Sequence, residues 1–531
     1  MIKFRIFALI LFTLFLIGCS NSTAPEASLP TTAPTAVLAS LATQPAPIST
    51  QPAATNTPVP QPPTPTVELP TITPQAPIRI AVAPEWETAV SEAISTQTGI
   101  RWQLIVSDNP LANLNENSAQ IAITNSTEGT LVHQEPIVLS VPFTTEWEAV
   151  TLAEAQQIID QGHALAQVSK WTDIPPMSKT LRVDGYAPDD AAYPLQKRLS
   201  LTAVPNTETA VAQLTTALQE QLNNDPVFRL TAVGDIMLAR RLGATISNGK
   251  PEWPFANVAS YFHEADFVVG NMESALGTLG APAAKSYPFQ APPEAANALA
   301  LAGIDVVSLA NNHGMDYGPE ALLDAIQLLN NANVAPIGAG ANFDEAHAPY
   351  ITEVNGLSLA LFGYLDVPVE ARSAFDTETW TATATEPGLA WANADEIHAD
   401  ITAVKDQVDL VIAVLHSGYE YIEEPSEEQV TAAKAAIDAG ADIVIGHHAH
   451  ILQGIEFYND GVIIYGLGNF AFDIDGDPNT AILNVWLDKN GVRNLELIPA
   501  IVDSGGQPRI ANETEAKSIL QKVYFLTMLL N

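Results

Sequence analysis

Three clustered histidines mark the segment of this chain most suited to chemistry. The stretch DIVIGHHAH ends an apolar run with a glycine and then places His447, His448 and His450 within four residues. The whole chain of 531 residues contains only 10 histidines. Burying imidazoles next to one another is costly once any of them is charged. Metal binding is therefore the favoured interpretation of this segment.

Other reactive residues follow apolar runs in the same way. Six expected strands each end beside such a residue: 227–233, 266–270, 304–309, 409–415, 442–446 and 461–467. The residues after these strands, besides the histidine cluster, are Asp235, Glu273, Asn312, His313, Asp316, His416 and Asn469. In open α/β sheets, ligands bind at the carboxyl ends of the strands. We therefore expect these side chains to converge on one site.

The residue types indicate which ligand they would bind. Carboxylates, a carboxamide and imidazoles without a thiolate suit two divalent ions such as Mn²⁺, Fe²⁺ or Zn²⁺. A pair of such ions activates water and stabilises the oxygens of a displacement reaction. A ligand that bridges two ions must be a carboxylate, because an imidazole nitrogen has one lone pair to give. Asp235 or Glu273 could bridge.

Each residue alone also has a structural interpretation. Asp235 could form a turn after its glycine, and Glu273 could pair with an arginine such as Arg240. Asn312 and Asp316 could cap the helix that Pro319 begins. The joint pattern over six strand ends favours the metal site over these alternatives.

The elements that position these residues predict a layered α/β fold. Region 223–531 alternates short apolar runs with helical patterns. Expected helices include 319–332 and 426–439, and Ser426 with Gln429 predicts a capping box for the second. Late strands at 480–487 and 494–501 are expected to be antiparallel.

A smaller α/β domain is expected in region 77–222. IRIAVAP predicts a strand, and 86–96 and 152–161 predict helices. The segment FTTEWEAVTLAEAQQIIDQG resembles part of the periplasmic solute-binding proteins. A ligand-binding role and a spacer role both remain open for this region.

The N-terminal segments predict export and anchoring. Lys3 and Arg5 precede an apolar run that ends in LIGC, so residues 1–19 resemble a bacterial lipoprotein signal peptide with Cys19 as the lipidated residue. An uncleaved membrane anchor is the alternative. Residues 20–76, rich in Pro, Thr and Ala, predict a disordered stalk. Either interpretation places the rest of the chain outside the cytoplasm, attached to a membrane of the cell envelope.

Composition excludes some classes of function. The net charge of −38 and the pI near 4.3 argue against nucleic acid as a partner. One cysteine excludes an intramolecular disulfide and a cysteine-based zinc site.

Six motifs in order carry a resemblance to a known family. GDIMLAR, NMESALG, SLANNHGMDYG, HSGYEY, GHHAHILQGIE and IIYGLGNFAFD resemble the motifs of the CapA family of bacterial capsule and poly-γ-glutamate synthesis proteins, over about residues 227–475. The family is similar to calcineurin-like metallophosphatases. This resemblance implies a four-layer metallophosphatase-like β-sandwich flanked by helices for region 223–531.

The resemblance also implies roles for individual residues. The implied metal ligands are Asp235, Glu273, Asn312, His416, His448 and His450. Glu273 would bridge both ions, Asp235 and His450 would bind the first, and the remaining three would bind the second. His313 would act as general acid or substrate clamp, oriented by Asp316.

Further expectations concern the residues that contact the substrate and the positions that differ from the phosphatase superfamily. Arg240, Lys285 and Asn469 are expected to contact the substrate. His447 is expected to point away from the ions. Met237 stands where the phosphatase superfamily has a histidine, so the first metal site is expected to be weak or empty.

The expected function is metal-dependent hydrolysis or transfer on poly-γ-glutamate or another anionic envelope polymer, alongside other capsule-synthesis membrane proteins. A non-catalytic polymer-binding or assembly subunit is one alternative. A small-molecule metallophosphodiesterase is the other.

Overall fold

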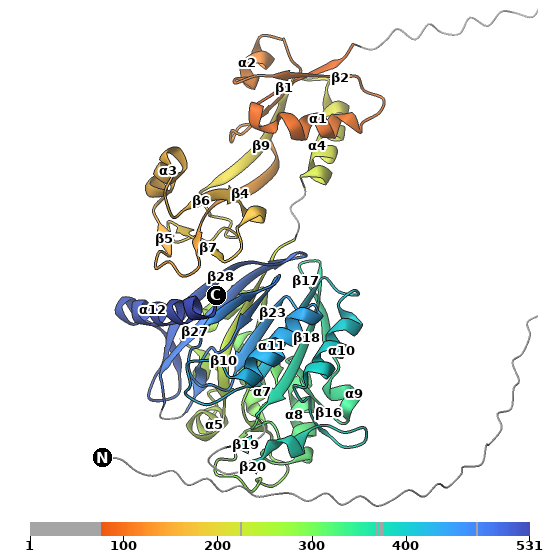
Figure 1. Ribbon diagram of the computed structural model, residues 1–531. Helices are drawn as coiled ribbons and strands as arrows, with labels where there is room; N and C mark the ends of the chain where they lie inside the picture. The colour runs from red at the N-terminus through yellow and green to blue at the C-terminus, as the bar shows by residue number, and fades with distance from the viewer. Residues whose placement is uncertain (1–75, 223–225, 368, 371–374, 474–475) are drawn as a thin grey trace, which may run out of the picture. The chain divides into compact units, whose positions relative to one another are not determined.

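A mixed sheet carries the first half of the motifs (Figure 1). The computed structural model describes residues 76–222, 226–367, 369–370, 375–473 and 476–531. The sheet has the order β15-β14-β11-β10-β27-β28-β29, with β26 beside β10. Its strands are β10 (Phe228–Met237), β11 (Phe267–Met272), β14 (Val306–Ser308), β15 (Ala335–Ile337), β26 (Asn469–Phe472), β27 (Asn479–Asp488), β28 (Gly491–Val502) and β29 (Pro508–Ile510). Strands β10, β11, β14 and β15 are parallel, and β27 and β28 are antiparallel, as the sequence predicts.

A second sheet carries the remaining histidines, in the order β17-β18-β22-β23-β25-β24. Its strands are β17 (Tyr350–Val354), β18 (Leu357–Asp366), β22 (Leu410–Ser417), β23 (Ile443–His447), β24 (Ile455–Tyr458) and β25 (Gly461–Ile464). Strands β18, β22, β23 and β25 are parallel. Every residue of β22 and β23 is buried, which is typical of parallel strands covered on both faces.

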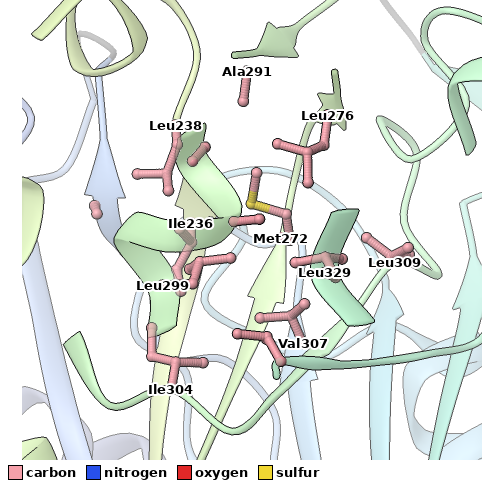
Figure 2. Packing of buried hydrophobic residues seen from close by; sticks show 14 of the residues in the cluster. Ile236, Leu238, Met272, Leu276, Ala291, Leu299, Ile304, Val307, Leu309 and Leu329 are labelled. Carbon is pink, nitrogen blue, oxygen red and sulfur yellow. The ribbon is translucent and has the colours of Figure 1, made fainter. Parts of the chain in front are cut away.

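The two sheets face each other across a shared apolar core. Leu230 and Leu483 of the first sheet and Ile412 and Ile445 of the second belong to this core. The outer face of the first sheet packs against α5 (Arg240–Ser247), α7 (Glu294–Ala302) and α8 (Pro319–Asn331). Figure 2 shows Leu299 of α7 and Leu329 of α8 among residues of the sheet, which are Ile236 of β10, Met272 of β11 and Val307 of β14. The outer face of the second sheet packs against α10 (Ala394–Val404) and α11 (Glu427–Ala439).

The layers therefore follow the order helices, sheet, sheet, helices, and the mixed α/β class is confirmed. The helix α12 (Glu513–Leu530) lies against β24 and β28. The capping box of α11 is confirmed, since the side chain of Ser426 accepts from the backbone of Gln429. The expected strand 461–467 is shorter than predicted. It ends at Ile464, and the chain then turns at Gly468, whose φ of 73° favours glycine, to enter β26.

The preceding region contains its own sheet, in the order β2-β1-β3-β9-β4-β6 with β7 beside β4. Its main strands are β1 (Ile78–Val82), β2 (Trp102–Val106), β3 (Ile121–Thr124), β4 (Thr130–Pro142), β6 (Gln167–Lys170), β7 (Ser178–Thr180) and β9 (Gln196–Ala203). Its helices are α1 (Glu87–Ser95), α2 (Pro110–Asn115), α3 (Leu152–Gln161) and α4 (Glu208–Gln221). The domain boundaries and the likeness to solute-binding proteins stay predictions.

The N-terminal predictions fall on residues 1–75, which lie outside the described residues. These are the signal peptide, Cys19 and all of the stalk except its last residue. No helix within the described ranges has both the length and the apolar character that a membrane span requires.

Candidate metal centre

Strand ends from both sheets bring the reactive residues together. Asp235 of β10 stands in register with Asn271 of β11, and His416 of β22 stands in register with His447 of β23. Contacts then join the sheets. His447 Nδ1 lies 3.0 Å from Asp235 Oδ1, and His416 Nδ1 lies 3.1 Å from the amide of Asn271. The convergence that the sequence predicts at the carboxyl ends of the strands is therefore observed.

Two groups of ligand atoms at this convergence could each hold a metal ion. One group is Glu273, His416 and His448, and the other is Asp235, Glu273 and His450. Within each group, the ligand atoms all lie within 4.8 Å of one another. The two groups share Glu273. This division matches the one that the family resemblance implies, and metal binding by each residue stays a prediction.

Glu273 is a buried carboxylate without a hydrogen bond from any described residue. It is fully buried, and neither carboxylate oxygen has a hydrogen-bond partner. Its oxygen Oε1 lies 3.8 Å from His416 Nε2 and 3.7 Å from His450 Nε2. Leaving an ionised group unsatisfied in the interior is expensive, so the arrangement fits a cation between these side chains. Arg240, the alternative structural partner, instead lies over the ring of Phe289.

Asp235 has an unexpected partner in His447. The structure shows that the prediction for His447 is wrong, because its imidazole faces Asp235 rather than pointing away. The backbone N–H of His448 also approaches Asp235, at 3.4 Å from Oδ2. His450 Nδ1 lies 3.3 Å from the same oxygen, outside hydrogen-bond geometry. The second nitrogen of His447 is buried without a hydrogen-bond partner among the described residues.

Backbone conformation places the last two histidines. His448 has φ of 85° and His450 has φ of 56°, both in the left-handed region that favours glycine. Such conformations cost free energy and tend to persist at functional sites. Strand β23 ends at His447, so side chains beyond it no longer alternate between two faces. That is why three histidines in four residues can all face the same centre.

Two asparagines that the sequence did not single out hold the ligands in place. Asn271 donates to Asp235 Oδ1 at 2.9 Å and also contacts His416, while Asn311 donates to Asn271 Oδ1 at 3.0 Å. All three contacts are buried. Asn312, an expected ligand, places its amide oxygen 2.9 Å from His416 Nε2. The position of Asn271 directly after a strand, two residues before Glu273, was the one available signal for this network.

The protonation states fit a metal centre. Burial lowers the pKa of His416 well below its usual range, and the charge of a protonated His448 would lower it further. Burial and the charge of His450 lower the pKa of His448 to about 3. Both imidazoles are therefore neutral and have a lone pair to give. Although burial alone would raise it, contacts with His447 and His450 hold the pKa of Asp235 well below its usual range.

The pKa values of Glu273 and His450 are raised instead of lowered. Burial and the nearby charge of Asp235 raise the pKa of Glu273 well above its usual range. Burial would lower the pKa of His450, but Glu273 and Asp235 raise it to about 9. These two side chains retain protons that a bound cation would displace. The donor set, the unsatisfied oxygens of Glu273 and this charge pattern together fit divalent metal ions.

His313 sits at the end of a chain of buried contacts. Its Nδ1 lies 2.7 Å from Asp316 Oδ2, as the sequence predicts for an oriented histidine. The backbone N–H of Phe289 donates to the same oxygen at 2.6 Å. Lys285 pairs with Asp316 Oδ1 at 2.8 Å and donates to the carbonyl of Asn312 at 2.6 Å. The side chain of Lys285 is fully buried, so its contacts support His313, and its expected substrate contact stays a prediction.

The remaining predicted residues surround this centre. Arg240 is exposed at the start of α5, five residues after Asp235. Asn469 begins β26 beside Asp235, and its amide oxygen is buried without a hydrogen-bond partner in the described ranges. Met237 packs in an apolar cluster with Phe289 and Phe472 and supplies no ligand.

With this geometry in place, comparison with known sequences defines the class of protein. Residues 229–474 match the family model described as "Bacterial capsule synthesis protein PGA_cap". The chain belongs to the CapA family of bacterial capsule synthesis proteins.

Two Bacillus relatives show the degree of sequence similarity within the family. The chain is 32% identical to "Capsule biosynthesis protein CapA" of Bacillus anthracis, over 55% of this chain and 72% of the relative. It is 31% identical to "PGA biosynthesis protein CapA" of Bacillus subtilis (strain 168), over 56% of this chain and 78% of the relative. Among solved structures, it is similar to a putative 5'-nucleotidase from Staphylococcus aureus, with a TM-score of 0.32 and 14% identity over 56% of this chain and 58% of that one. That structural likeness is too distant to define the fold.

Proposed function

We propose that this protein carries out metal-dependent hydrolysis or transfer on an anionic polymer of the cell envelope, such as poly-γ-glutamate. The observation that carries this proposal is the pair of ligand groups that share the buried, unsatisfied Glu273. Family membership and the names of the two Bacillus relatives support capsule polymer synthesis as the process. The order of layers supports a metallophosphatase-like arrangement for region 223–531.

The residues of the centre would have two roles, binding the cations and orienting the ligands. When bound, divalent cations supply Lewis-acid polarisation and water activation. Glu273 would be held between both ions, and the neutral imidazoles of His416 and His448 would bind through their lone pairs. Asn271 and His447 would hold the carboxylate of Asp235 in its binding orientation through the contacts at 2.9 and 3.0 Å.

His313 is the proposed proton donor. Asp316 accepts from Nδ1 of the imidazole, which leaves Nε2 to exchange a proton with the leaving group. Lys285 and the backbone of Phe289 fix Asp316, so the imidazole is held in one orientation. Stacking on the Phe289 ring, at 4.4 Å between centroids, restrains it further.

The setting of this activity is proposed from the sequence. A lipidated Cys19 at the end of a signal peptide would anchor the chain on the outer side of a membrane, and residues 20–76 would hold the folded part away from the surface. Other membrane proteins of capsule synthesis are the proposed partners.

Metal content of the full-length protein tests the proposal. We expect bound divalent ions in the wild type by mass spectrometry, and their loss in His448→Ala. His347→Ala is a matched control, because His347 is equally buried, at 4% exposed, but pairs with Asp400 away from the centre. The same three proteins would be assayed for cleavage or transfer on poly-γ-glutamate, followed by the length of the polymer.

The outcomes separate the candidates. Ions in the wild type, with turnover lost only in His448→Ala, would support the proposal. A wild type that binds no ions after exposure to Mn²⁺, Fe²⁺ or Zn²⁺ would refute it. Bound ions with polymer binding but no turnover would favour the assembly subunit. Turnover of small phosphodiesters alone would favour the phosphodiesterase.

A further inference from the structure

Arg240 is held in a costly backbone conformation next to the metal centre. It is the first residue of α5 and has φ of 49°, in the left-handed region. For a residue other than glycine, this backbone conformation costs on the order of 1–3 kcal/mol of free energy. Its side chain is nevertheless exposed. The surrounding structure therefore directs this arginine toward a particular place on the surface.

The guanidinium of Arg240 lies over two aromatic rings, and one of these rings also contacts His313. The guanidinium carbon of Arg240 lies 4.5 Å from the centroid of Phe289 and 5.9 Å from that of Tyr287. Phe289 also stacks on the imidazole of His313, at 4.4 Å between ring centroids and an interplanar angle of 28°. Because both groups contact one ring, the guanidinium lies no more than about 9 Å from the imidazole, within reach of a single ligand.

The charge of Arg240 is not neutralised by an ion pair with a described carboxylate. Its neighbour Arg241 pairs with Asp473 through its side chain and its backbone N–H. Arg240 donates to the backbone carbonyl of Asp473 at 3.5 Å, and although burial raises the pKa of the Asp473 carboxyl, Arg241 and, less strongly, Arg240 lower it.

The N–H donors of the guanidinium are the part of Arg240 that an anionic ligand would contact. The aromatic rings attract the positive charge of the group through their π faces, whereas its N–H donors lie in the guanidinium plane and point outward from its edge. An edge of this kind accepts two oxygens of a carboxylate or a phosphate through parallel hydrogen bonds. Tyr287, which is 49% exposed, extends the apolar platform beneath such a ligand.

We propose that Arg240, supported by Phe289 and Tyr287, forms an oxyanion subsite. It would hold the carboxylate or phosphate group of the substrate unit next to the bond that reacts beside His313. The subsite deepens the proposed function and rests on it for the reaction, but binding at Arg240 can be measured without turnover. It would make the anionic character of the polymer a requirement for productive binding.

Binding of defined oligomers to the full-length protein tests the subsite. The probes are a γ-linked glutamate hexamer, its α-methyl ester, and an oligomer of glycerol phosphate. The proteins are the wild type, Arg240→Ala, Arg240→Lys and Arg101→Ala. Arg101 is an exposed arginine of the preceding region, so its replacement changes the net charge equally. Metal content is measured on every sample.

We expect Arg240→Ala to weaken hexamer binding about 10- to 100-fold, the range for a lost bidentate charge-assisted pair. Arg240→Lys should recover part of this loss, Arg101→Ala should stay within about 2-fold of the wild type, and no variant should bind the ester differently. Loss confined to the glycerol phosphate oligomer would support the subsite with phosphate as its ligand.

Equal binding of every anionic probe by the wild type and Arg240→Ala would overturn the subsite. So would a wild type that binds the ester as tightly as the acid. A wild type without metal ions that still shows Arg240-dependent binding would refute the proposed reaction and retain the subsite. The two proposals can therefore fail separately.

Discussion

Replacing Glu273 by glutamine should have opposite effects on stability with and without metal ions. Glu273→Gln keeps the shape of the side chain and replaces the carboxyl by an amide, which is neutral at every pH and cannot become a carboxylate ligand. Without ions, the wild type must keep a proton on a buried carboxyl that lies beside Asp235 and has no hydrogen-bond partner among the described residues, and at neutral pH this protonation costs free energy. The variant relieves that cost. With ions, the wild type gains binding free energy through the group that both ligand sets share, and the variant does not.

The magnitudes follow from these contacts. An ion at 100 times its dissociation constant stabilises the folded protein by about 2.7 kcal/mol. Since about 1 kcal/mol changes the Tm of a large domain by about 2 °C, the wild type should gain about 5 °C and the variant less than about 1 °C. Without ions, Glu273→Gln should be as stable as the wild type or more stable by about 1 kcal/mol, because the amide is neutral without taking up a proton at neutral pH.

Calorimetry on chelator-treated protein, before and after addition of Mn²⁺ or Zn²⁺, measures both effects. Glu456→Gln is the matched control. Glu456 is also buried, but it accepts from Tyr465 at 2.7 Å and pairs with Lys434 at 2.8 Å. The control should lose similar stability with and without ions. Equal stabilisation of Glu273→Gln and the wild type by ions, or a large loss of stability in metal-free Glu273→Gln, would refute the reasoning.

Three further predictions concern the surroundings of the centre. Burial raises the pKa of Asp442 to about 6, so the folded wild type loses stability as this carboxyl ionises between about pH 4 and about pH 6. Asp442→Asn should therefore be more stable than the wild type by about 1–2 kcal/mol at pH 7 but not at pH 4. Urea midpoints at the two pH values would measure this difference. Gly446→Ala should destabilise the protein by about 3 kcal/mol, because its Cβ would lie 2.3 Å from the carbonyl oxygen of Tyr465; an unchanged urea midpoint would contradict this packing. His447→Ala removes the contact at 3.0 Å that orients Asp235, so metal affinity should fall about 10- to 100-fold in a competition titration with a chromophoric chelator, and unchanged affinity would rule out that role.

Much of the candidate site was predictable because it depends on local pattern. The apolar runs that become β10, β11, β14, β22 and β23 are buried on both faces and are read directly from composition. Parallel strands deliver their carboxyl ends to one edge, so polar residues that follow several such runs must meet. The pairing of His313 with Asp316 is equally local, three residues apart.

Tertiary contacts decided the rest. The family resemblance implied that His447 points away from the ions, but its imidazole faces Asp235 where β23 ends and His448 takes φ of 85°. The burial of Lys285 against Asp316 joins residues 31 positions apart, and no periodicity encodes such a pair.

The sequence by itself determined the elements, the class of fold and the set of residues that could bind metal, since each depends on the order of apolar and polar side chains. Only the tertiary structure decided that Asn271 and Asn311 hold the ligands, that His447 faces Asp235, and that Arg240 lies over Phe289 rather than pairing with Glu273. These relations join distant segments, and their geometry depends on how two sheets and their loops pack against one another.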